Sequence, residues 1–413
     1  MGTKDSAMYF HIQFPAEVVK IAKILADHGH NAYAVGGCVR DSLMGRSPSD
    51  WDMTTDANPD EMLKIFKAED LSTIPTGLKH GTVTVIMDKK PFEITTFRID
   101  GEYTDSRRPD NVVFSLNIDE DLRRRDFTVN AMAANPLCES TEVVDLFGGL
   151  EDIKKQVIRC VGDPTERFSE DALRILRAIR FSSVLGFEIE KSTLYAMTKL
   201  SYRLADISAE RKTVELEKTL LSDTADYGFE MLSQIGATEY IHKGFHAPCV
   251  PLTSLPKSFP VRLAALIEGD RRPSLAEMKL SNKISHLASL LADRAFYDEC
   301  SRFFDDDIRA NARYMISKYR EDAEAAAMLR NDNALASAIS EERAIGNFAT
   351  EIKDLAVDGN TLMAAGVPQK SLGVILAKLL LLAIKVPQTN NADTLTEMAK
   401  SLLMKGDLQD DCI

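Results

Sequence analysis

The sequence predicts an α+β protein in which a mixed α/β domain comes first and helices alone follow it. Before about residue 155 the chain is dominated by short runs rich in β-branched and aromatic residues, and after it apolar residues recur with helical period. The chain has 413 residues, of which 45% are hydrophobic and 27% charged. This composition is typical of a globular protein, and the length predicts roughly two to four domains rather than one core.

The N-terminal part is expected to form a sheet that contains a hairpin. The third and fourth predicted strands are joined only by Lys89, Lys90 and Pro91, so they are expected to pair with each other. The predicted strands cover residues 31–37, 50–55, 82–88, 92–98, 111–117 and 141–147.

The C-terminal part is expected to be helical throughout. Loop signals interrupt it at residues 242–260 and 268–274, and it contains no repeat. The most apolar stretch, residues 373–386, is interrupted by Lys378 and Lys385 and is too short to span a bilayer, which predicts a largely buried helix and no membrane partner. Before that stretch, helices are predicted at residues 169–185, 191–200, 208–222, 226–235, 260–268 and 285–293.

Charge and cysteine content restrict the partners and the compartment. The formal net charge of −13 argues at first against a nucleic-acid partner, but arginine is concentrated at residues 121–127 and 170–181 while acid collects elsewhere, so a local basic cleft for RNA stays possible. The six cysteines form no CxxC pair, and the first residues have no apolar core of a signal peptide. We therefore expect reduced thiols and a cytoplasmic protein.

Two carboxylates one residue apart, Asp50 and Asp52, are the first candidate site. In a strand both would share one face and repel each other, unless a divalent cation lay between them. Glu93, on the predicted hairpin, can project toward them if the two strands are neighbours. Three such acids suit a two-metal site for nucleotidyl or phosphoryl transfer.

A glycine pair offers a cradle for phosphate. Gly36 and Gly37 precede a short helical run that ends at Gly45, so free backbone N–H groups at the helix start could meet a triphosphate, and Arg40 would add a charged fork.

Asp171 and Arg174 are the candidate base-reading pair. If both lie on the helix predicted at 169–185, they are three residues apart and their side chains lie side by side. An acceptor beside a donor can recognise the exocyclic amine and ring acceptor of cytosine and of adenine, whereas uracil and guanine present the reverse pattern. Arg177 and Arg180 continue the stripe and could hold phosphate or stack on a base.

Each motif also has a structural interpretation. Asp50 and Asp52 could be a solvated strand end, the glycine pair an ordinary turn, and Asp171 with Arg174 a routine surface ion pair. A catalytically inactive RNA-binding scaffold is a further possibility, but such a scaffold has no need to keep metal ligands and base-reading groups together.

In order and spacing, these motifs resemble a known family. The segments "GGCVRD", "SDWDMTT", "KHGTVTV", "FEITTFR", "RRRDFTVNAMA", "DLFGGLEDIKKQVIRCVGDP", "EDALRILRAIRF" and "SAERKTVELEKTLL" are similar to those of the bacterial class II tRNA nucleotidyltransferases and poly(A) polymerases over about residues 30–220. The resemblance implies a polymerase-β-like nucleotidyltransferase head (residues 1–154), followed by an all-α neck that recognises the base (155–222), a body (223–330) and a tail that binds tRNA (331–413).

The resemblance also implies an activity. It predicts a CCA-adding enzyme that extends the 3′ end of tRNA from CTP and ATP without a nucleic-acid template, with Mg²⁺ as cofactor. Metal binding falls on Asp50 and Asp52, with Glu93 as a third catalytic carboxylate. The implied nucleotide contacts are Gly36, Gly37, Arg40, Arg125, Asp126, Asn130, Asp171, Arg174, Arg177 and Arg180. Within "SAERKTVELEK", the residues Glu210, Arg211 and Glu215 are expected to brace the base-reading helix.

The resemblance also bears on the related activities found in the same family. Some relatives carry an HD phosphohydrolase domain, and the absence of a His-Asp dipeptide after residue 200 predicts that this chain has none. A poly(A) polymerase or an enzyme that adds only A stays open as the alternative. The loop from Tyr103 to Asp110, which a CC-only enzyme would be expected to lack, is expected to help the site switch from C to A.

Overall fold

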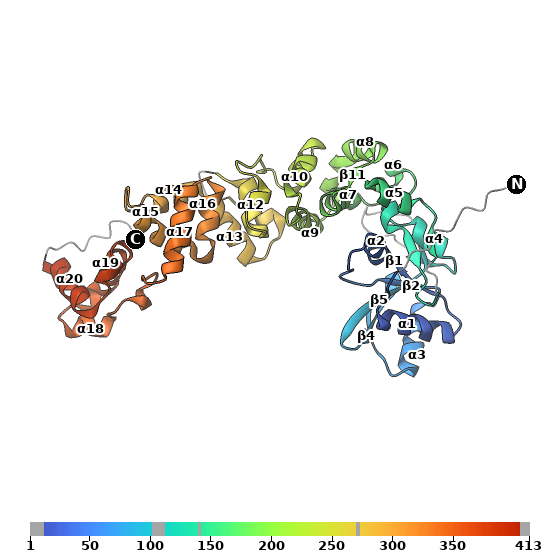
Figure 1. Ribbon diagram of the computed structural model, residues 1–413, viewed down its shortest axis with the longest axis horizontal. Coiled ribbons are helices and arrows are strands. Elements are labelled where there is room, and N and C mark those ends of the chain that lie inside the picture. The colour runs from blue at the N-terminus through green and yellow to red at the C-terminus, as the bar shows by residue number, and fades with distance from the viewer. Residues whose placement is uncertain (1–11, 101–111, 139–141, 270–272, 405–413) are drawn as a thin grey trace. The chain divides into compact units, whose positions relative to one another are not determined.

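The computed structural model describes residues 12–100, 112–138, 142–269 and 273–404. It forms two compact units, Met1–Lys243 and Gly244–Ile413, each of which is described by itself. A mixed sheet lies near the start of the first unit and helices make up most of the rest, so the predicted α+β class is confirmed (Figure 1). The predicted boundaries at 154, 222 and 330 stay predictions, and the loop 103–110 lies outside the described residues.

A seven-stranded mixed sheet forms the head of the first unit, in the order β3-β4-β5-β2-β1-β8-β9. β2 and β5 are parallel, and the other neighbouring strands are antiparallel. The predicted hairpin is confirmed as β4 and β5, while β3, β6 and β8 were not predicted. The strands are β1 (Ala32–Val35), β2 (Met53–Thr55), β3 (Ser72–Gly77), β4 (Thr82–Met87), β5 (Lys90–Thr96), β8 (Met132–Ala134) and β9 (Val143–Asp145), with β6 (Arg98–Asp100) and β7 (Val112–Phe114) paired apart from the sheet.

Apolar side chains of two helices cover one face of this sheet. Ile21 and Leu25 of α1 and Phe66 of α3 are buried in one core with Met53 and Ile94 of the central strands. Figure 1 shows α1 and α3 beside each other at the sheet. The head helices are α1 (Ala16–Asp27), α2 (Gly37–Leu43), α3 (Pro59–Ala68), α4 (Ile118–Arg123) and α5 (Gly149–Lys155).

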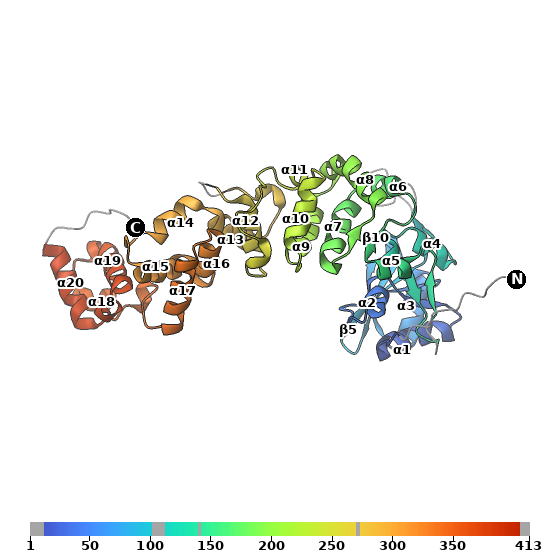
Figure 2. The ribbon, with the colours of Figure 1, turned by 45° about the horizontal axis from the view of Figure 1, so that its top comes forward.

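Helices follow the head within the same unit. The short strands β10 (Val157–Ile158) and β11 (Glu188–Ile189) pair in parallel there, and Figure 2 shows α7, α9 and α10 side by side. The helices are α6 (Pro164–Glu170), α7 (Leu173–Leu185), α8 (Lys191–Leu200), α9 (Ala209–Leu220), α10 (Ala225–Gln234) and α11 (Thr238–Ile241).

One predicted helix, at 169–185, is wrong because the chain breaks inside it. α6 ends at Glu170, Asp171 is extended with φ −143° and ψ 103°, and α7 begins at Leu173. The Asp171 carboxylate accepts a hydrogen bond of 3.0 Å from the N–H of Leu173, which satisfies a free donor of the new helix. Asp171 and Arg174 therefore do not share a helix, although they are three positions apart in the chain.

The second unit is helical, as predicted. The apolar stretch 373–386 lies in α19, where Ile375, Leu379, Ala383 and Ile384 are buried. Among the described residues, no helix has both the length and the apolarity that crossing a bilayer requires. The helices are α12 (Phe259–Ile267), α13 (Asn282–Ala292), α14 (Arg294–Ser301), α15 (Ile308–Tyr319), α16 (Ala323–Leu329), α17 (Asn333–Ile345), α18 (Gly359–Ala364), α19 (Leu372–Lys385) and α20 (Ala392–Met404).

A buried arginine joins three helices of the second unit. Arg313 of α15 donates to the Glu342 carboxylate of α17 at 2.8 Å and to the carbonyl oxygens of Ile384 and Lys385, at the end of α19, at 2.6 and 2.9 Å. Arg309, one helical turn earlier, reaches the same glutamate at 3.0 Å, but its side chain is 58% exposed against 8% for Arg313. The buried cation therefore both balances Glu342 and caps the last turn of α19.

We predict that Arg313→Ala lowers the free energy of unfolding of the second unit by about 3–5 kcal/mol, because it leaves Glu342 without its buried partner and two carbonyl groups without their donor. Arg309→Ala is the matched control and should cost less than about 1 kcal/mol, since its pair is solvated. Calorimetry measures both losses, and the fluorescence of Trp51, the one tryptophan of the sequence, reports whether the first unit is unchanged. Equal losses in the two variants would contradict the assignment.

Candidate functional site

The glycine turn after β1 places a helix start beside the sheet. The N–H of Gly36 donates to the Met132 carbonyl of β8 at 3.1 Å, and the N–H of Val35 donates to the Asp52 carbonyl at 3.0 Å. The predicted short helix is confirmed as α2, which begins at Gly37, one residue earlier than predicted. The turn is therefore fixed by the two strands on either side of β1, directly beside the first acidic motif.

Gly36 has two reasons to be glycine. Its backbone has φ 80° and ψ −128°, a conformation that a side chain makes costly. A Cβ built there would also lie 3.1 Å from Nη1 of Arg125. The absence of a side chain lets this guanidinium group approach the turn, which brings a cation to the place where the phosphates of a nucleotide were predicted.

Arg40 is a buried arginine, and two hydrogen bonds orient its guanidinium group. Its Nε donates to the adjacent Asp41 at 2.9 Å, and its Nη1 donates to Oδ1 of Asn130. Arg40 and Asn130 are 7% and 6% exposed. Two residues that the resemblance assigned to nucleotide binding thus meet in one buried hydrogen bond.

The acidic motif lies at the start of β2 and not within it. β2 begins at Met53, so Asp50 and Asp52 precede the strand, and the prediction that both lie on one face of a strand is wrong. The predicted neighbour relation is confirmed: Met53 of β2 pairs with Ile94 of β5, which places Glu93 level with Asp52.

The electrostatics of Asp52 indicate a crowded acidic site. Burial and then the negative charge of Asp50 raise the pKa of Asp52 above its ordinary value, the charge of Arg125 lowers it, and that of Glu93 adds a smaller rise. A carboxylate that is buried among other carboxylates is stabilised in its charged form by a cation.

The donor set fits a hard divalent cation, because it consists of carboxylate oxygens. Within the described ranges, no three His, Cys, Asp or Glu side chains lie close enough together to enclose a metal ion. Asp50 and Asp52 would thus supply part of a coordination shell, as is usual where substrate phosphate supplies further oxygens. The role of Glu93 stays a prediction.

Asp126 forms the closest link between the head and the helices that follow it. Its Oδ2 accepts hydrogen bonds from Nε and Nη2 of Arg177 on α7, at 2.7 and 2.6 Å, and its Oδ1 accepts the N–H of Phe127 at 2.9 Å. Burial alone would raise the pKa of Asp126, but the charge and hydrogen bonds of Arg177 outweigh burial and lower it to about 2. The pair fixes α7 against the segment that carries Arg125 and Asn130.

Sequence reasoning missed Asp121, which is fully buried. Its carboxylate accepts from Arg124 at 2.7 and 3.0 Å and from Arg125 at 3.1 Å. Burial opposes ionisation, yet the charges of Arg125 and Arg124 lower the pKa of Asp121. The spacing of three and four residues within "DLRRRDF" was the available signal, and it was interpreted only as a concentration of arginine.

The two candidate base-reading residues have different partners. Oδ2 of Asp171 accepts from Nη2 of Arg211 on α9 at 2.7 Å. Arg174 donates from Nη2 to the Arg124 carbonyl at 3.2 Å, and its Nη1 binds the Glu170 carboxylate. Each side chain is held by a neighbour, and Arg174 is bonded directly to the segment that carries Asp126.

α9 braces the start and the body of α7 through Arg211 and Glu215, as the resemblance implied, whereas Glu210, the third residue of that prediction, is exposed. In addition to the bond between Arg211 and Asp171, Glu215 pairs with Nε of Arg180 at 3.2 Å. Phe181, which the sequence did not single out, follows Arg180 and has arginine side chains near its ring. An apolar residue in a helix gives no local sign of such a contact, so nothing in the sequence alone indicated it.

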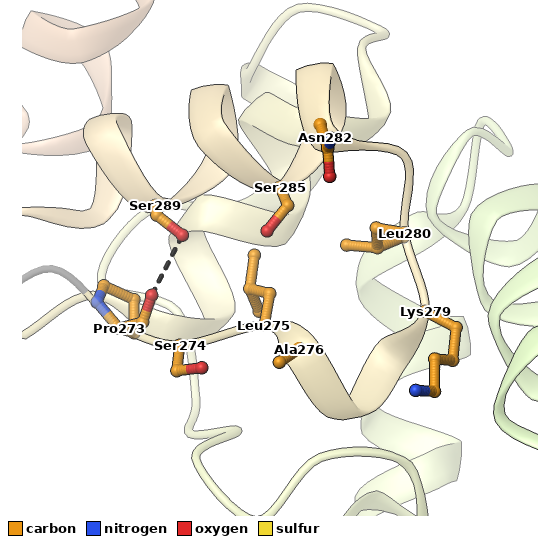
Figure 3. A pocket seen from close by; sticks show the side chains of 9 residues that line it. All are labelled: Pro273, Ser274, Leu275, Ala276, Lys279, Leu280, Asn282, Ser285 and Ser289. Carbon is orange, nitrogen blue, oxygen red and sulfur yellow. Dashed lines mark hydrogen bonds between the residues drawn. The ribbon is translucent and has the colours of Figure 1, made fainter.

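A pocket of about 440 Å³ in the second unit has a different character (Figure 3). Oγ of Ser289 donates to the Pro273 carbonyl across it at 2.9 Å. Among the described residues that line it, Lys279 carries the one charge, so this pocket lacks the carboxylates of the head.

The mixed sheet, the glycine turn and the paired carboxylates define the class as a nucleotidyltransferase head with a helical extension. Two family models match it: residues 32–159 match the poly A polymerase head domain, and residues 186–248 match the probable RNA and SrmB-binding site of polymerase A.

Similar proteins have a consistent description. The CCA-adding enzyme of Leuconostoc mesenteroides is 46% identical over 232 residues, which are 55% of this chain and 56% of that protein. That of Bacillus subtilis is 43% identical over 230 residues, 56% of each chain. The chain thus spans about half the length of the curated relatives it matches.

Solved structures extend the similarity over more of the chain. The structure of the Bacillus stearothermophilus CCA-adding enzyme in complex with CTP has a TM-score of 0.76 and 29% identity, and the match covers 96% of this chain and 98% of that one. The Thermotoga maritima CCA-adding enzyme complexed with tRNA, at a TM-score of 0.69 and 20% identity over 94% of this chain and 95% of that one, shares the fold. The chain is thus similar to CCA-adding enzymes, in sequence over about half of its length and in fold over nearly all of it, and its residues 32–159 match the poly A polymerase head domain.

We predict that Asp126→Asn lowers the free energy of unfolding at pH 7 by about 2 kcal/mol, because a carboxylate with a pKa of about 2 instead of 3.8 favours the folded state while it is ionised. The folded-state pKa is the lower one, so this contribution is complete above 3.8 and is lost as the pH falls toward about 2. Denaturant unfolding of both proteins, followed by Trp51 fluorescence between pH 7 and pH 2, should show the difference closing in that window. A difference that does not change with pH would contradict the ion pair.

Proposed function

We propose that this chain is a CCA-adding tRNA nucleotidyltransferase, which adds C, C and A to the 3′ end of tRNA from CTP and ATP without a nucleic-acid template. In each step the terminal 3′ oxygen of the RNA bonds to the α-phosphorus of the nucleotide, the bond to the bridging oxygen breaks, and pyrophosphate leaves. The similar proteins carry this activity in their names, and one of them is described in complex with CTP.

The observation that carries the proposal is the double attachment of α7 to one segment of the head. Arg174 donates to the Arg124 carbonyl, and Arg177 pairs with Asp126. Arg125 lies between Arg124 and Asp126 in the chain. Its guanidinium group lies next to the Gly36 turn, and its charge lowers the pKa of Asp52. A nucleotide whose triphosphate lies at the turn would therefore place its base toward α7.

The proposed roles follow from the donors available. Arg40 and Arg125, with the backbone at Gly36 and Gly37, bind the triphosphate, and Asn130 keeps Arg40 directed toward it. Asp126, held by Arg177, is proposed to lie at the ribose. Arg177 and Arg180 neighbour the nucleotide.

Base selection is assigned to Asp171 and Arg174. Cytosine and adenine both present an exocyclic amine beside a ring nitrogen that accepts, so an Asp acceptor and an Arg donor satisfy both bases. Uracil and guanine would place a carbonyl against the carboxylate and an N–H against the guanidinium. A site built on that pattern can reject the wrong base by roughly 10⁴-fold.

Asp50 and Asp52 are proposed to hold Mg²⁺, with Glu93 as the third catalytic carboxylate. Bound there, divalent cations would lower the pKa of the attacking hydroxyl and stabilise the charge that develops on the leaving pyrophosphate. The cytoplasmic location and the absence of an HD phosphohydrolase domain stay predictions.

We predict that Asp50→Asn and Asp52→Asn each abolish addition of both C and A, because each removes a metal-binding carboxylate, while folding and tRNA binding change little. The assay incubates the full chain with a tRNA transcript that lacks its CCA end, labelled CTP or ATP, and Mg²⁺. Asp60→Asn, an exposed substitution of the same kind on the head, is the control and should be as active as the unchanged chain.

Retention of more than a few per cent of the activity in either variant would refute the metal assignment. Products with many A residues from the unchanged chain would instead favour a poly(A) polymerase, and extension only of a transcript that already ends in CC would favour an enzyme that adds A alone.

We predict that Asp171→Ala keeps the metal requirement but loses most of the preference for CTP and ATP over UTP and GTP, because the discriminating acceptor is gone. Asp206→Ala, which removes an exposed carboxylate nearby in the chain, is the control. Single-nucleotide incorporation with each of the four nucleotides measures the preference. An unchanged preference would mean that Asp171 serves only to hold Arg211 and to cap α7.

A further inference from the structure

Three guanidinium groups surround the ring of Phe181 on α7. The central carbon of Arg180 lies 4.1 Å from the ring centroid, that of Arg177 5.3 Å and that of Arg40 5.4 Å. The ring also meets the edge of Phe127, with centroids 5.8 Å apart and an interplanar angle of 78°. Phe127 is fully buried while Phe181 is only half-buried, so Phe181 lies where the apolar core meets the arginine cluster.

The three arginines come from two parts of the site. Arg40 belongs to α2, on the phosphate side, whereas Arg177 and Arg180 belong to α7, on the base side. Each has an oxygen partner of its own: Asn130 and Asp41 for Arg40, Asp126 for Arg177, and Glu215 for Arg180. These partners lie on different elements, and the ring of Phe181 is the group that all three arginines approach.

Three like charges gathered at one ring repel each other, and the aromatic face attracts each of them. The ring therefore offsets part of the repulsion and holds the three guanidinium groups at fixed separations before an anion binds. A leucine would fill much of the same volume but has no negative face.

We infer that Phe181 is a positioning residue that couples triphosphate binding to base reading. A triphosphate that binds Arg40 changes how Arg40 packs against the ring, and Arg177 and Arg180 pack against the same ring. These two arginines lie on the helix that begins just before Arg174. The orientation of α7, and with it that of the base-reading pair, then depends on whether a triphosphate is bound at Arg40. This inference rests on the proposed function and deepens it.

The test compares three variants of the full chain. Phe181→Leu removes the ring, Phe181→Tyr keeps it, and Phe187→Leu makes the same substitution at a buried phenylalanine two residues after the end of α7. For each, the thermal midpoint, equilibrium binding of CTP, and kcat and KM for CTP, ATP and UTP on a CCA-less tRNA transcript are measured.

Phe181→Leu is expected to raise KM for CTP and ATP by the same factor, roughly tenfold, through the loss of two or three cation–π contacts. It is also expected to lower the preference for CTP over UTP by roughly tenfold. Phe181→Tyr should restore both, and Phe187→Leu should lower the thermal midpoint without changing the preference.

Two results would overturn the inference. One is a Phe181→Leu variant that follows Phe187→Leu, with activity reduced only in proportion to lost stability. The other is a raised KM with an unchanged preference for CTP over UTP, which would mean that the ring serves phosphate binding alone.

Failure of the proposed function gives a different pattern. If the unchanged chain adds no nucleotide to tRNA, competition of UTP with CTP in the equilibrium measurement replaces the kinetic preference. If Phe181→Leu then binds CTP more weakly and with a reduced preference over UTP, and Phe181→Tyr restores both, the inference is supported although the proposed function has failed. If Phe181→Leu binds CTP as the unchanged chain does, the inference is overturned as well.

Discussion

The ion pair between Asp126 and Arg177 is the interaction on which the rest of the site depends. Both oxygens of the carboxylate are occupied, one by the guanidinium group and one by the backbone of Phe127, and the carboxylate is buried. A buried pair of this kind is costly to break, because each partner would be left without compensation in a poorly solvated place. It therefore determines one position of α7 against the head, and the approach of Arg40 on α2 to the ring of Phe181 on α7 presupposes that position.

The same pair shows how an acidic chain can present a cationic site. With a net charge of −13 the chain as a whole repels polyanions, yet Arg40 and Arg125 lie at the glycine turn, and Arg40 also lies near the same ring as Arg177. Asp121 and Asp126, the acidic partners of Arg125 and Arg177, are buried, so these two carboxylates orient the arginines while exposing little negative charge to a ligand. Net charge consequently says little about a site whose counter-charges are hidden inside the fold.

Local patterns in the sequence predicted much of the fold, and contacts between distant segments account for what was missed. The β4–β5 hairpin and the helix α8, found at the predicted residues 191–200, follow from alternation and helical period within a few residues. The break at Asp171 was not predicted. The helical spacing of apolar residues in α7 extends without interruption across the acidic residues that precede this helix, so a single helix was expected. Phe181 was missed because Arg40, one of its partners, lies on another element. Asp121 was missed because its burial, unlike the spacing of its arginine partners, cannot be read from the local sequence.

The candidate site also shows why some of its groups oppose stability while others support it. Asp126 has a lowered pKa because its partner is part of the fold, so the folded chain gains from its charge. Asp52 has a raised pKa because it is buried and, to a lesser extent, because its neighbours are acids, so its charge makes the fold less stable until a cation binds. The first carboxylate is thus satisfied within the protein and the second is not, although both lie close to Arg125 in the chain or in space. This difference separates a group that positions the site from one that is left free to bind, and neither residue type nor sequence spacing could reveal it, because both are aspartates beside arginine-bearing motifs.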